Sequence, residues 1–465
     1  MAGLSGATGT GVFTERRTRL HGWGRTAATS AIVHDVQRDG LGAALAEAGE
    51  RGALARGLGR SYGDAAQNAG GLVLRLHGSL TDTVIDATHA TARVPAGVSI
   101  DDLLKLIVPR GFFVPVTPGT RQVTIGGAIA SDIHGKNHHL EGSFGSHVLA
   151  MTMMLADGSV VEADRDNNSE LFWATIGGMG LTGIVLDAAV RLIPIETSKV
   201  AVDTDRLGDL DALFAAMTEG DHRYRYSVAW IDLIAKGAHL GRSVLTRCDH
   251  ATIDQLPSGH TGDPLAYDAR QLIAVPPIVP PSGLLNHASI AAFNEFWFRK
   301  APRHRVQELQ GIGPFFYPLD LVGSWNRLYG RLGMVQYQFV VPFGAEATMR
   351  TVIERLVDSG SASFLAVLKR FGASNPAPLS FPAPGWTLAL DVPAGSRDLG
   401  ELLHSLDRIV LDAGGRHYFA KDAHTTPAAI RRGYPRLDEW KAVRERFDPH
   451  HLWQSDLARR LELID

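Results

Sequence analysis

Three glycine-rich segments fall within the first 185 residues of the chain, at 57–64, 118–127 and 177–180. Glycine lets the backbone approach a ligand closely and turn successive N–H groups toward one point, which makes a concave site for an anion. One such segment would be a weak indication. Three together predict a cofactor that carries a nucleotide diphosphate and is wrapped by the chain.

The glycine segments do not match the two common nucleotide fingerprints. Gly57, Gly59 and Gly63 are spaced G-x-G-x-x-x-G, which places the third glycine one position too late for a dinucleotide fingerprint. No G-K-[ST] sequence closes any of the three segments, so a P-loop is excluded. A standard Rossmann domain is therefore disfavoured.

A histidine-rich segment at 134–139 also contains Lys136. Imidazole is a common metal ligand, but His134 and His138 would share a face only on a helix, which Gly135 disfavours. We therefore expect no metal site. Lys136 has two interpretations that stay open, a positive charge beside a phosphate or an oxidised ring, and a solvated loop residue.

Lys421 follows a strand-like stretch that begins at the glycine pair 414–415. In a partly desolvated pocket the pKa of a lysine falls toward the working range of a proton acceptor. Most lysines are exposed to solvent, and that is the alternative. Nucleophilic hydrolysis is poorly supported, because the chain has no G-x-S-x-G motif and Ser61 has no evident base beside it.

Apolar spacing predicts helices and strands around these segments. In the first half we expect helices over 44–53, over 101–107 behind an acidic N-cap, and over 170–175, a strand over 71–76, hairpins over 81–98 and 148–161, and a strand over 183–195. This mixture does not alternate strand and helix as a doubly wound parallel sheet would.

The sequence changes character beyond about Pro194, and we place a second domain there. It has longer strands with aromatic residues, such as 224–231 and 335–342, and helices such as 345–358. Residues 264–289 include a proline-rich run that predicts a long mobile loop, either a surface linker or a lid over a site.

Composition limits the possible functions. With 465 residues, 45% of them hydrophobic, the chain can bury a large core and is expected to form two domains. The net charge of −3 offers no broad positive field, so we expect no nucleic-acid partner. Cys248 is the sole cysteine, which excludes an intramolecular disulfide. Residues 1–29 lack the apolar core of a signal peptide, and no apolar run reaches 18 residues, so any membrane role must be peripheral.

Six motifs, taken in order, resemble a known family. They are Ala55-Arg-Gly-Leu-Gly-Arg-Ser-Tyr-Gly-Asp64, Pro118-Gly-Thr-Arg-Gln-Val-Thr124, Asp132-Ile-His-Gly-Lys-Asn-His-His139, Glu170-Leu-Phe-Trp-Ala-Thr175, Leu379-Ser-Phe-Pro-Ala-Pro-Gly-Trp386 and Ala420-Lys-Asp422. They resemble the FAD-dependent oxidases of the vanillyl-alcohol oxidase fold, and most closely those that oxidise decaprenylphosphoryl-β-D-ribose. Each motif alone is modestly specific, whereas their order and spacing along nearly the whole chain are strongly so.

The resemblance implies an α+β fold. An FAD-binding domain of the vanillyl-alcohol oxidase (PCMH) type would comprise residues 1–197 and 416–465, and residues 198–415 would form an inserted substrate domain on an antiparallel sheet. Carried over position by position, the residues that would hold FAD are Ala55, Arg56, Gly57, Leu58, Gly59, Arg60, Ser61, Tyr62, Gly63, Asp64, Gly119, Thr124, Ile125, Gly126, Gly127, Ser131, Asp132, Ile133, His134, Val185 and Tyr418.

The implied reaction oxidises the ribose 2′-hydroxyl of decaprenylphosphoryl-β-D-ribose to the 2′-keto sugar, the first half of an epimerisation to the arabinose donor for cell-wall arabinan. Lys421 matches the essential lysine, and Tyr62 would assist it. The substrate would contact His134, Lys136, Gln336, Gln338, Lys369, Thr387 and Ala389. A separate reductase would complete the epimerisation. The resemblance places the protein in the cell envelope, peripheral to the inner membrane and on its periplasmic side, while the missing signal peptide leaves the cytoplasmic face open.

The chain departs from the family at two places. Many relatives attach FAD through a histidine near the first glycine segment, but this chain has Arg60, Ser61 and Tyr62 there, so we expect noncovalent FAD. Where similar enzymes carry an active-site cysteine this chain has Ala389, with Thr387 in place of an asparagine. We therefore expect turnover without covalent trapping by nitroaromatic inhibitors.

Two other functions stay open from the sequence. One is an FAD-dependent oxidase of a small soluble alditol or aldonolactone, for which no lipid is needed. The other is a noncatalytic flavin- or nucleotide-binding subunit, in which Lys421 would be structural. If the substrate is a polyprenyl-phosphoryl ribose, the loop over 264–289 would give its lipid tail room to enter.

Overall fold

The computed structural model describes residues 17–258, 262–281, 283–361 and 363–464. Residues 1–16, at the N-terminus in which we found no signal-peptide pattern, and Ser282, within the loop expected over 264–289, lie outside the described residues. No helix in the described part of the chain is both long and apolar enough to span a membrane.

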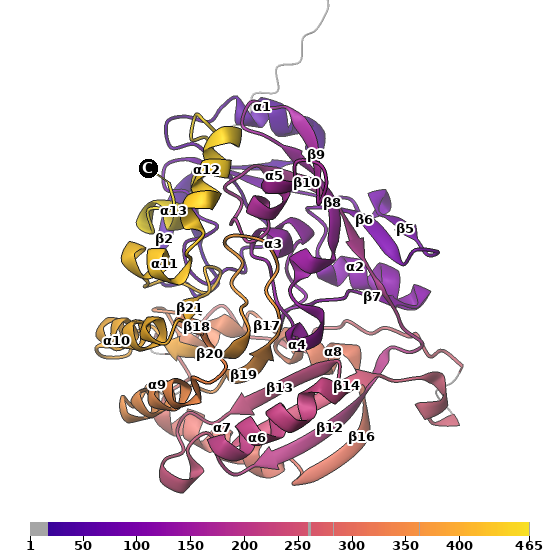
Figure 1. The fold of residues 1–465 in the computed structure, drawn as a ribbon, viewed down its shortest axis with the longest axis vertical. Coiled ribbons are helices and arrows are strands. Elements are labelled where there is room, and N and C mark those ends of the chain that lie inside the picture. Colours follow the sequence, from indigo (N-terminus) through magenta and orange to yellow (C-terminus); the bar gives the residue numbers. More distant parts are fainter. Residues whose placement is uncertain (1–16, 259–261, 282, 362, 465) are drawn as a thin grey trace, which may run out of the picture.

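Two sheets from the first 195 residues occupy the upper part of Figure 1. Their strands are β1 (Arg17–His21), β2 (Ala28–Val36), β3 (Ala53–Ala55), β4 (Leu72–Leu76), β5 (Val84–Asp86), β6 (Thr91–Pro95), β8 (Val148–Met154), β9 (Val160–Asp164) and β10 (Ile184–Arg191), with β7 (Phe112–Phe113) and β11 (Ile193–Pro194) as a separate pair. In the first sheet β2, β4 and β3 run parallel and β1 antiparallel. The second sheet is antiparallel, in the order β5-β6-β10-β8-β9.

Short helices connect these strands, and the end of the chain packs back onto them (Figure 1). The helices are α1 (Leu41–Leu45), α2 (Ile100–Ile107), α3 (Ile125–Ala130), α4 (His138–Glu141), α5 (Ser169–Thr175), α11 (Pro427–Gly433), α12 (Leu437–Phe447) and α13 (Asp456–Arg460). The indole N–H of Trp440, on α12, donates to the carbonyl of Ala174 on α5 at 2.9 Å. Trp453 pairs with Ala53 through an isolated bridge. The first and last parts of the chain therefore share one packed unit.

The middle of the chain forms an eight-stranded antiparallel sheet in the lower part of Figure 1. Its strands are β12 (Lys199–Leu207), β13 (Tyr226–Ile231), β14 (Ser243–His250), β16 (His304–Gly311), β18 (Met334–Pro342), β19 (Ala366–Phe371), β20 (Gly385–Pro393) and β21 (Arg416–His417), in the order β16-β12-β14-β13-β19-β20-β18-β21. The helices of this part are α6 (Leu210–Gly220), α7 (His287–Lys300), α8 (Ile312–Phe316), α9 (Glu346–Asp358) and α10 (Leu399–Asp412), and a short parallel pair joins β15 (Ile273–Ala274) to β17 (Val322–Gly323).

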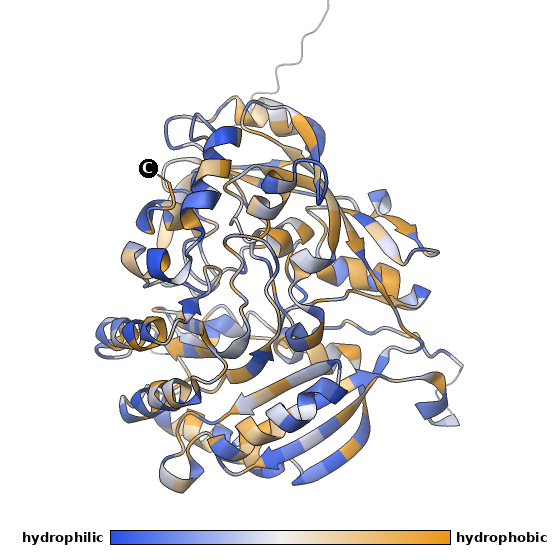
Figure 2. Cartoon of the chain, viewed as in Figure 1, coloured by the Kyte–Doolittle hydropathy of each residue, from blue (hydrophilic) through white to orange (hydrophobic). Residues whose placement is uncertain are grey.

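The two faces of the large sheet differ in chemistry because side chains alternate along a strand. On β18, Val335, Tyr337 and Phe339 pack into an apolar core with residues of α6, α9 and α10. Figure 2 shows both apolar and polar colours along α9 and α10, as expected for helices with one buried side. The intervening Gln336 and Gln338 point away from this core. The face of the sheet opposite these helices therefore carries polar side chains.

Most predicted elements are present, with three corrections. The predicted helix over 44–53 is wrong: α1 ends at Leu45, and the backbone then turns through Gly52, whose φ of +60° is left-handed, into β3. Helix α2 is capped by Ser99, which accepts from the Asp102 N–H at 3.0 Å, rather than by an acidic residue. The loop expected over 264–289 contains β15, and its last residues belong to α7.

Candidate active site

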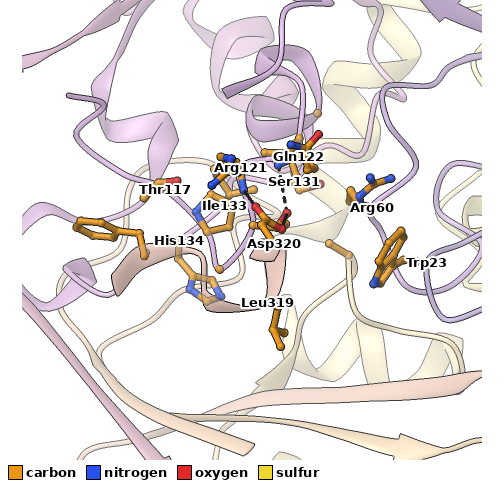
Figure 3. A pocket seen from close by; sticks show the side chains of 18 of the residues that line it. Trp23, Arg60, Thr117, Arg121, Gln122, Ser131, Ile133, His134, Leu319 and Asp320 are labelled. Atoms are coloured by element: carbon orange, nitrogen blue, oxygen red, sulfur yellow. Dashed lines mark hydrogen bonds between the residues drawn. The ribbon is translucent and has the colours of Figure 1, made fainter. Parts of the chain in front are cut away.

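A cavity of about 1250 Å³ lies between the glycine segments and the polar face of the large sheet. Figure 3 shows Arg60 beside Trp23 on one side of the pocket, with Asp320 and His134 further along. The Arg60 guanidinium stands 4.3 Å from the centre of the Trp23 ring. The first, middle and last segments of the chain all line the cavity, since Tyr418 and Lys421 near the C-terminus also belong to its lining.

The first glycine segment forms a row of available donors at the cavity. Among the described residues, none accepts a hydrogen bond from the backbone N–H groups of Gly57 to Ser61. Gly59 is left-handed, with a φ of +63°, and a Cβ on Gly57 would lie 2.3 Å from Thr124 Oγ1. Such a cradle admits little besides glycine and aims N–H groups at one place, so it fits the pyrophosphate of FAD.

The second glycine segment is held at the start of α3. Thr124 Oγ1 accepts a hydrogen bond from the Gly127 N–H at 3.1 Å and caps the helix. A Cβ on Gly126 would lie 3.2 Å from the Ala96 Cβ, so the loop packs tightly against the strand side of the cavity. From the third segment, Gly180 lines the same cavity. All three segments predicted from the sequence therefore meet at one site.

Most of the residues expected to hold FAD line this cavity. They are Ala55, Arg56, Gly57, Leu58, Gly59, Arg60, Ser61, Tyr62, Gly119, Thr124, Gly126, Gly127, Ser131, Ile133, His134, Val185 and Tyr418.

Four of the expected FAD residues lie behind the cavity wall instead. Ile125 is fully buried in the core. Gly63 packs so closely that a Cβ would lie 2.0 Å from the Asp422 carbonyl oxygen. Asp64 forms an ion pair with Arg460 at 2.7 Å. The buried carboxylate of Asp132 accepts from the Gly145 N–H at 2.8 Å and from the Ser143 hydroxyl at 2.8 Å. These four residues shape the site and do not line it.

His134 lies at the centre of a polar network in the cavity. Its Nε2 is 2.9 Å from Gln338 Nε2, and its Nδ1 is 3.2 Å from Lys369 Nζ. Burial, followed by the nearby charge of Lys369, holds the pKa of His134 well below its ordinary value, so the ring is neutral. Burial and the repulsion of neighbouring lysines lower the pKa of Lys369 to about 7. A neutral ring and a readily titrated amine thus adjoin the same space.

Lys136 lines the cavity and is half-buried, and its contacts with the protein argue against its interpretation as a solvated loop residue. Its ammonium donates to the Phe315 carbonyl and lies 4.2 Å from the centre of the Phe315 ring. Burial lowers the pKa of Lys136 to about 8. No group of three or more His, Cys, Asp or Glu side chains among the described residues is arranged to hold a metal ion.

Lys421 reaches the cavity beside Tyr62, with its Nζ 4.1 Å from the centre of the tyrosine ring. Burial lowers the pKa of Lys421 to about 8, and the carboxylate of Asp391 opposes that shift. Gln336 forms a hydrogen bond with the Tyr62 hydroxyl and donates to Asp391 Oδ1. The amine is therefore poised to exchange a proton near neutral pH.

Ala389 and Thr387 alternate with apolar residues on β20. Ala389 lines the cavity, whereas Thr387 lies behind Gln338: it accepts from Gln338 Nε2 at 3.2 Å and donates to the Phe339 carbonyl at 2.8 Å. The structure therefore places Thr387 as a support for Gln338, without contact to the cavity.

Sequence reasoning missed two acidic residues at the site. Asp391 follows Ala389 by two positions on β20, so the alternation of strand residues places it on the same face. Asp320 accepts from Thr120 Oγ1 at 2.7 Å and from the Arg121 N–H at 2.8 Å, and so fixes the second glycine segment (Figure 3). No local pattern identifies Asp320, because its partners are 199 and 200 residues away.

Comparisons with known proteins agree with this geometry. Residues 30–164 match the family described as FAD binding domain, and residues 394–461 match the family described as D-arabinono-1,4-lactone oxidase. The chain is 47% identical over 464 residues to the decaprenylphosphoryl-beta-D-ribose oxidase of Mycolicibacterium smegmatis, a match that covers 97% of this chain and 99% of that protein. The chain belongs to the decaprenylphosphoryl-β-D-ribose oxidase family.

Other relatives match parts of this chain. An uncharacterised protein of Streptomyces coelicolor is 40% identical over 374 residues, 79% of this chain and 100% of its own. The L-gulonolactone oxidase of Mus musculus is 29% identical over 134 residues, 28% of this chain and 30% of its own.

Membership of the decaprenylphosphoryl-β-D-ribose oxidase family confirms the resemblance, the α+β fold with a PCMH-type FAD domain, and FAD as the cofactor. The protein is thus an FAD-dependent oxidoreductase. This outcome agrees with the expectation of an enzyme and disfavours the alternative of a noncatalytic flavin- or nucleotide-binding subunit.

Proposed function

We propose that this enzyme oxidises the 2′-hydroxyl of decaprenylphosphoryl-β-D-ribose to the 2′-keto sugar, the first half of an epimerisation that a separate reductase completes. The observation that carries the proposal is Lys421, a half-buried amine beside Tyr62 in the cavity that also contains the free N–H row of residues 57–61. The substrate of the Mycolicibacterium smegmatis relative, as its name gives it, supports the choice of sugar.

Different residues of the cavity have different roles in this reaction. The C2′–H bond breaks, the C2′–O bond becomes a carbonyl, and the hydroxyl proton passes to the neutral amine of Lys421. Bound FAD supplies the acceptor for the hydride. Tyr62, held by Gln336, and Gln338, held by Thr387, orient the sugar, so that geometry and electrostatics are the protein's contribution.

Positive charge in the cavity suits the phosphate of this substrate. Lys136 and Lys369 both line the cavity and are half-buried there, and Lys369 repels both Lys136 and Lys421. A phosphate dianion or monoanion relieves that repulsion and is stabilised strongly where water is excluded. We assign Lys136 and Lys369 to recognition of the phosphate and His134 to the placement of Lys369.

We also propose the division into an FAD domain, residues 1–197 and 416–465, and a substrate domain, residues 198–415. The pairing of Trp440 with Ala174 supports the return of the C-terminus to the first part. Strand β21, at Arg416–His417, pairs with β18 of the large sheet, so the second boundary lies within a shared strand layer. A lipid-linked substrate supports a cell-envelope location, peripheral to the inner membrane.

The decisive test is anaerobic mixing of the yellow protein with a polyprenyl-phosphoryl ribose while the flavin absorbance is followed. Rapid bleaching is expected. Bleaching by a soluble alditol or aldonolactone, but not by the lipid-linked ribose, would instead support the second candidate. That candidate is favoured by the match of residues 394–461 to D-arabinono-1,4-lactone oxidases. A protein that binds no flavin would contradict both.

A further inference from the structure

One loop exposes an unusual run of apolar residues. Residues 271–281 contain no charged side chain. Leu272 is 72% exposed, Ile273 64% and Ile278 88%. Proteins commonly expose large apolar side chains one at a time, and a cluster of them marks a surface that meets a partner.

Helix α7 presents a second apolar set on one stripe. Phe296 and Trp297 follow Phe293 by three and four residues, the exposures of Phe293, Phe296 and Trp297 are 38%, 61% and 40%, and Lys300 follows one turn later. Ile290 and Asn294, which border this set around the helix axis, are the buried residues of α7. We call the loop and helix residues together the apolar rim: Leu272, Ile273, Ile278, Phe293, Phe296 and Trp297.

The apolar rim lies at the active-site cavity. Gln271, next to Leu272, and Trp297 both line the cavity. The loop is fixed to the site from both directions, because Arg121 donates to the Ala269 carbonyl and β15 pairs with β17, whose two residues also line the cavity. The apolar rim therefore borders the active-site cavity.

Basic residues surround the apolar rim. Arg299, Lys300 and Arg303 are exposed at the end of α7 and beyond it, and Arg270 and Arg331 are exposed near the loop. The nearby carboxylate of Glu295 is paired with Arg242 and Arg299, and that of Asp268 with Arg270. In a chain whose net charge is −3, this is a locally positive border. Apolar side chains ringed by Arg and Lys fit the interface of an anionic lipid leaflet.

We propose that the apolar rim inserts into the headgroup region of an anionic membrane and seats the cavity entrance on the bilayer. The proposal rests on the proposed function in one respect: a decaprenyl tail cannot leave the bilayer, so an enzyme that oxidises the attached sugar must open toward it. The polyprenyl-phosphoryl ribose then enters head first while its tail stays among the lipids. Interfacial binding of this kind needs no membrane-spanning helix.

The first test measures binding of the FAD-loaded protein to sedimented vesicles. Vesicles of phosphatidylglycerol and phosphatidylethanolamine are compared with vesicles of phosphatidylcholine alone. We expect the double variant Leu272→Ser, Ile278→Ser and the single variant Phe296→Ser to lower the partition coefficient on anionic vesicles at least tenfold. Val84→Ser is the matched control, since Val84 is 67% exposed on β5 and should leave binding unchanged.

Two results would overturn the proposal. One is equal vesicle binding by the wild-type protein and the rim variants. The other is a wild-type dimer or larger assembly in size-exclusion chromatography that the rim variants convert to a monomer, which would assign the apolar rim to contacts between copies of the chain.

A second measurement separates failure of this proposal from failure of the proposed function. A short-chain, water-soluble polyprenyl-phosphoryl ribose is compared with the decaprenyl substrate embedded in anionic vesicles. The rim variants should oxidise the soluble substrate at the wild-type rate and the embedded one at least tenfold more slowly. Equal rates on the embedded substrate would contradict the membrane role. No oxidation of either substrate by the wild-type protein would contradict the proposed function, while the vesicle-binding result would still decide the role of the rim.

Discussion

At the scale of single residues, the proton acceptor sets the pH dependence of the reaction. Lys421 must be neutral to accept the hydroxyl proton, and its pKa is lowered to about 8 by burial. The rate at saturating substrate should therefore rise with pH and level off above about 8. Replacing Lys421 with Ala should lower kcat by roughly 10²- to 10⁴-fold, the usual contribution of a general base, while the flavin content stays at the wild-type level.

A substitution of Asp391 tests the assignment of Lys421 as the proton acceptor, because it removes a negative charge near the lysine. The carboxylate lies in the same buried group, accepts a hydrogen bond from Gln336, and opposes the fall in the pKa of Lys421. Its other oxygen, Oδ2, is buried and has no hydrogen-bond partner among the described residues. Removing the negative charge in Asp391→Asn should lower the pKa of Lys421 and move the acid limb of the pH–kcat profile down by about one unit, which corresponds to ~1.4 kcal/mol.

Thr387→Ser serves as the control for Asp391→Asn, because it keeps the hydroxyl that supports Gln338 and alters no charge. Its pH profile should match that of the wild-type enzyme. A loss of rate in Asp391→Asn that is equal at every pH would show a structural role for the carboxylate and contradict the electrostatic one.

Ala389 predicts how the enzyme responds to nitroaromatic inhibitors. The residue lines the cavity without a thiol, and Cys248, the single cysteine, is fully buried with its pKa raised by that burial. We expect such inhibitors to leave the intact mass of the wild-type protein unchanged after turnover. Ala389→Cys should gain one adduct. An adduct on the wild-type chain would contradict this prediction.

At the scale of elements, periodicity predicted the strands better than the short helices. Strand β18 was expected over 335–342, and alternation along it separates Gln336 and Gln338 from the apolar core. The helix expected over 44–53 was wrong, because Gly49 and Gly52 end a weak helical pattern in favour of β3. The glycine segments could be located from the sequence because a backbone that approaches a ligand closely requires glycine at those same positions.

The glycine cradle makes a prediction about FAD affinity. In Gly57→Ala the new methyl group would lie 2.3 Å from Thr124 Oγ1, which is held as the cap of α3, so the donor row must shift. We expect FAD affinity to fall at least tenfold, measured as the ratio of flavin to protein and by titration with FAD. Gly42→Ala, where a Cβ meets nothing within 4 Å, should retain the wild-type ratio. In both proteins acid precipitation should release the flavin, and retention would contradict noncovalent attachment.

At the scale of the whole molecule, contacts between distant parts of the chain hold the site together, and the sequence gives no local sign of them. The Arg460 guanidinium forms two hydrogen bonds with Asp64, 396 residues earlier, at 2.8 and 2.7 Å, and one with Asp422 at 2.8 Å. It thereby joins α13 to the first glycine segment and to the residue after Lys421. The family resemblance implied that Asp64 holds the cofactor, whereas in the structure Asp64 anchors the loop that faces the cavity.

This junction predicts a coupled loss of stability and flavin. Arg460→Met leaves the two largely buried carboxylates of Asp64 and Asp422 without their partner, which should cost roughly 3 kcal/mol of unfolding free energy. Adding Asp64→Asn should recover part of it, because one unpaired charge is removed. Arg431→Met, which breaks an exposed pair with Glu462, should cost about 0–1 kcal/mol. Denaturant unfolding of each FAD-loaded protein, with flavin fluorescence as a second probe, measures both losses. An Arg460 variant as stable as Arg431→Met would show that the C-terminal return contributes little to the cofactor site.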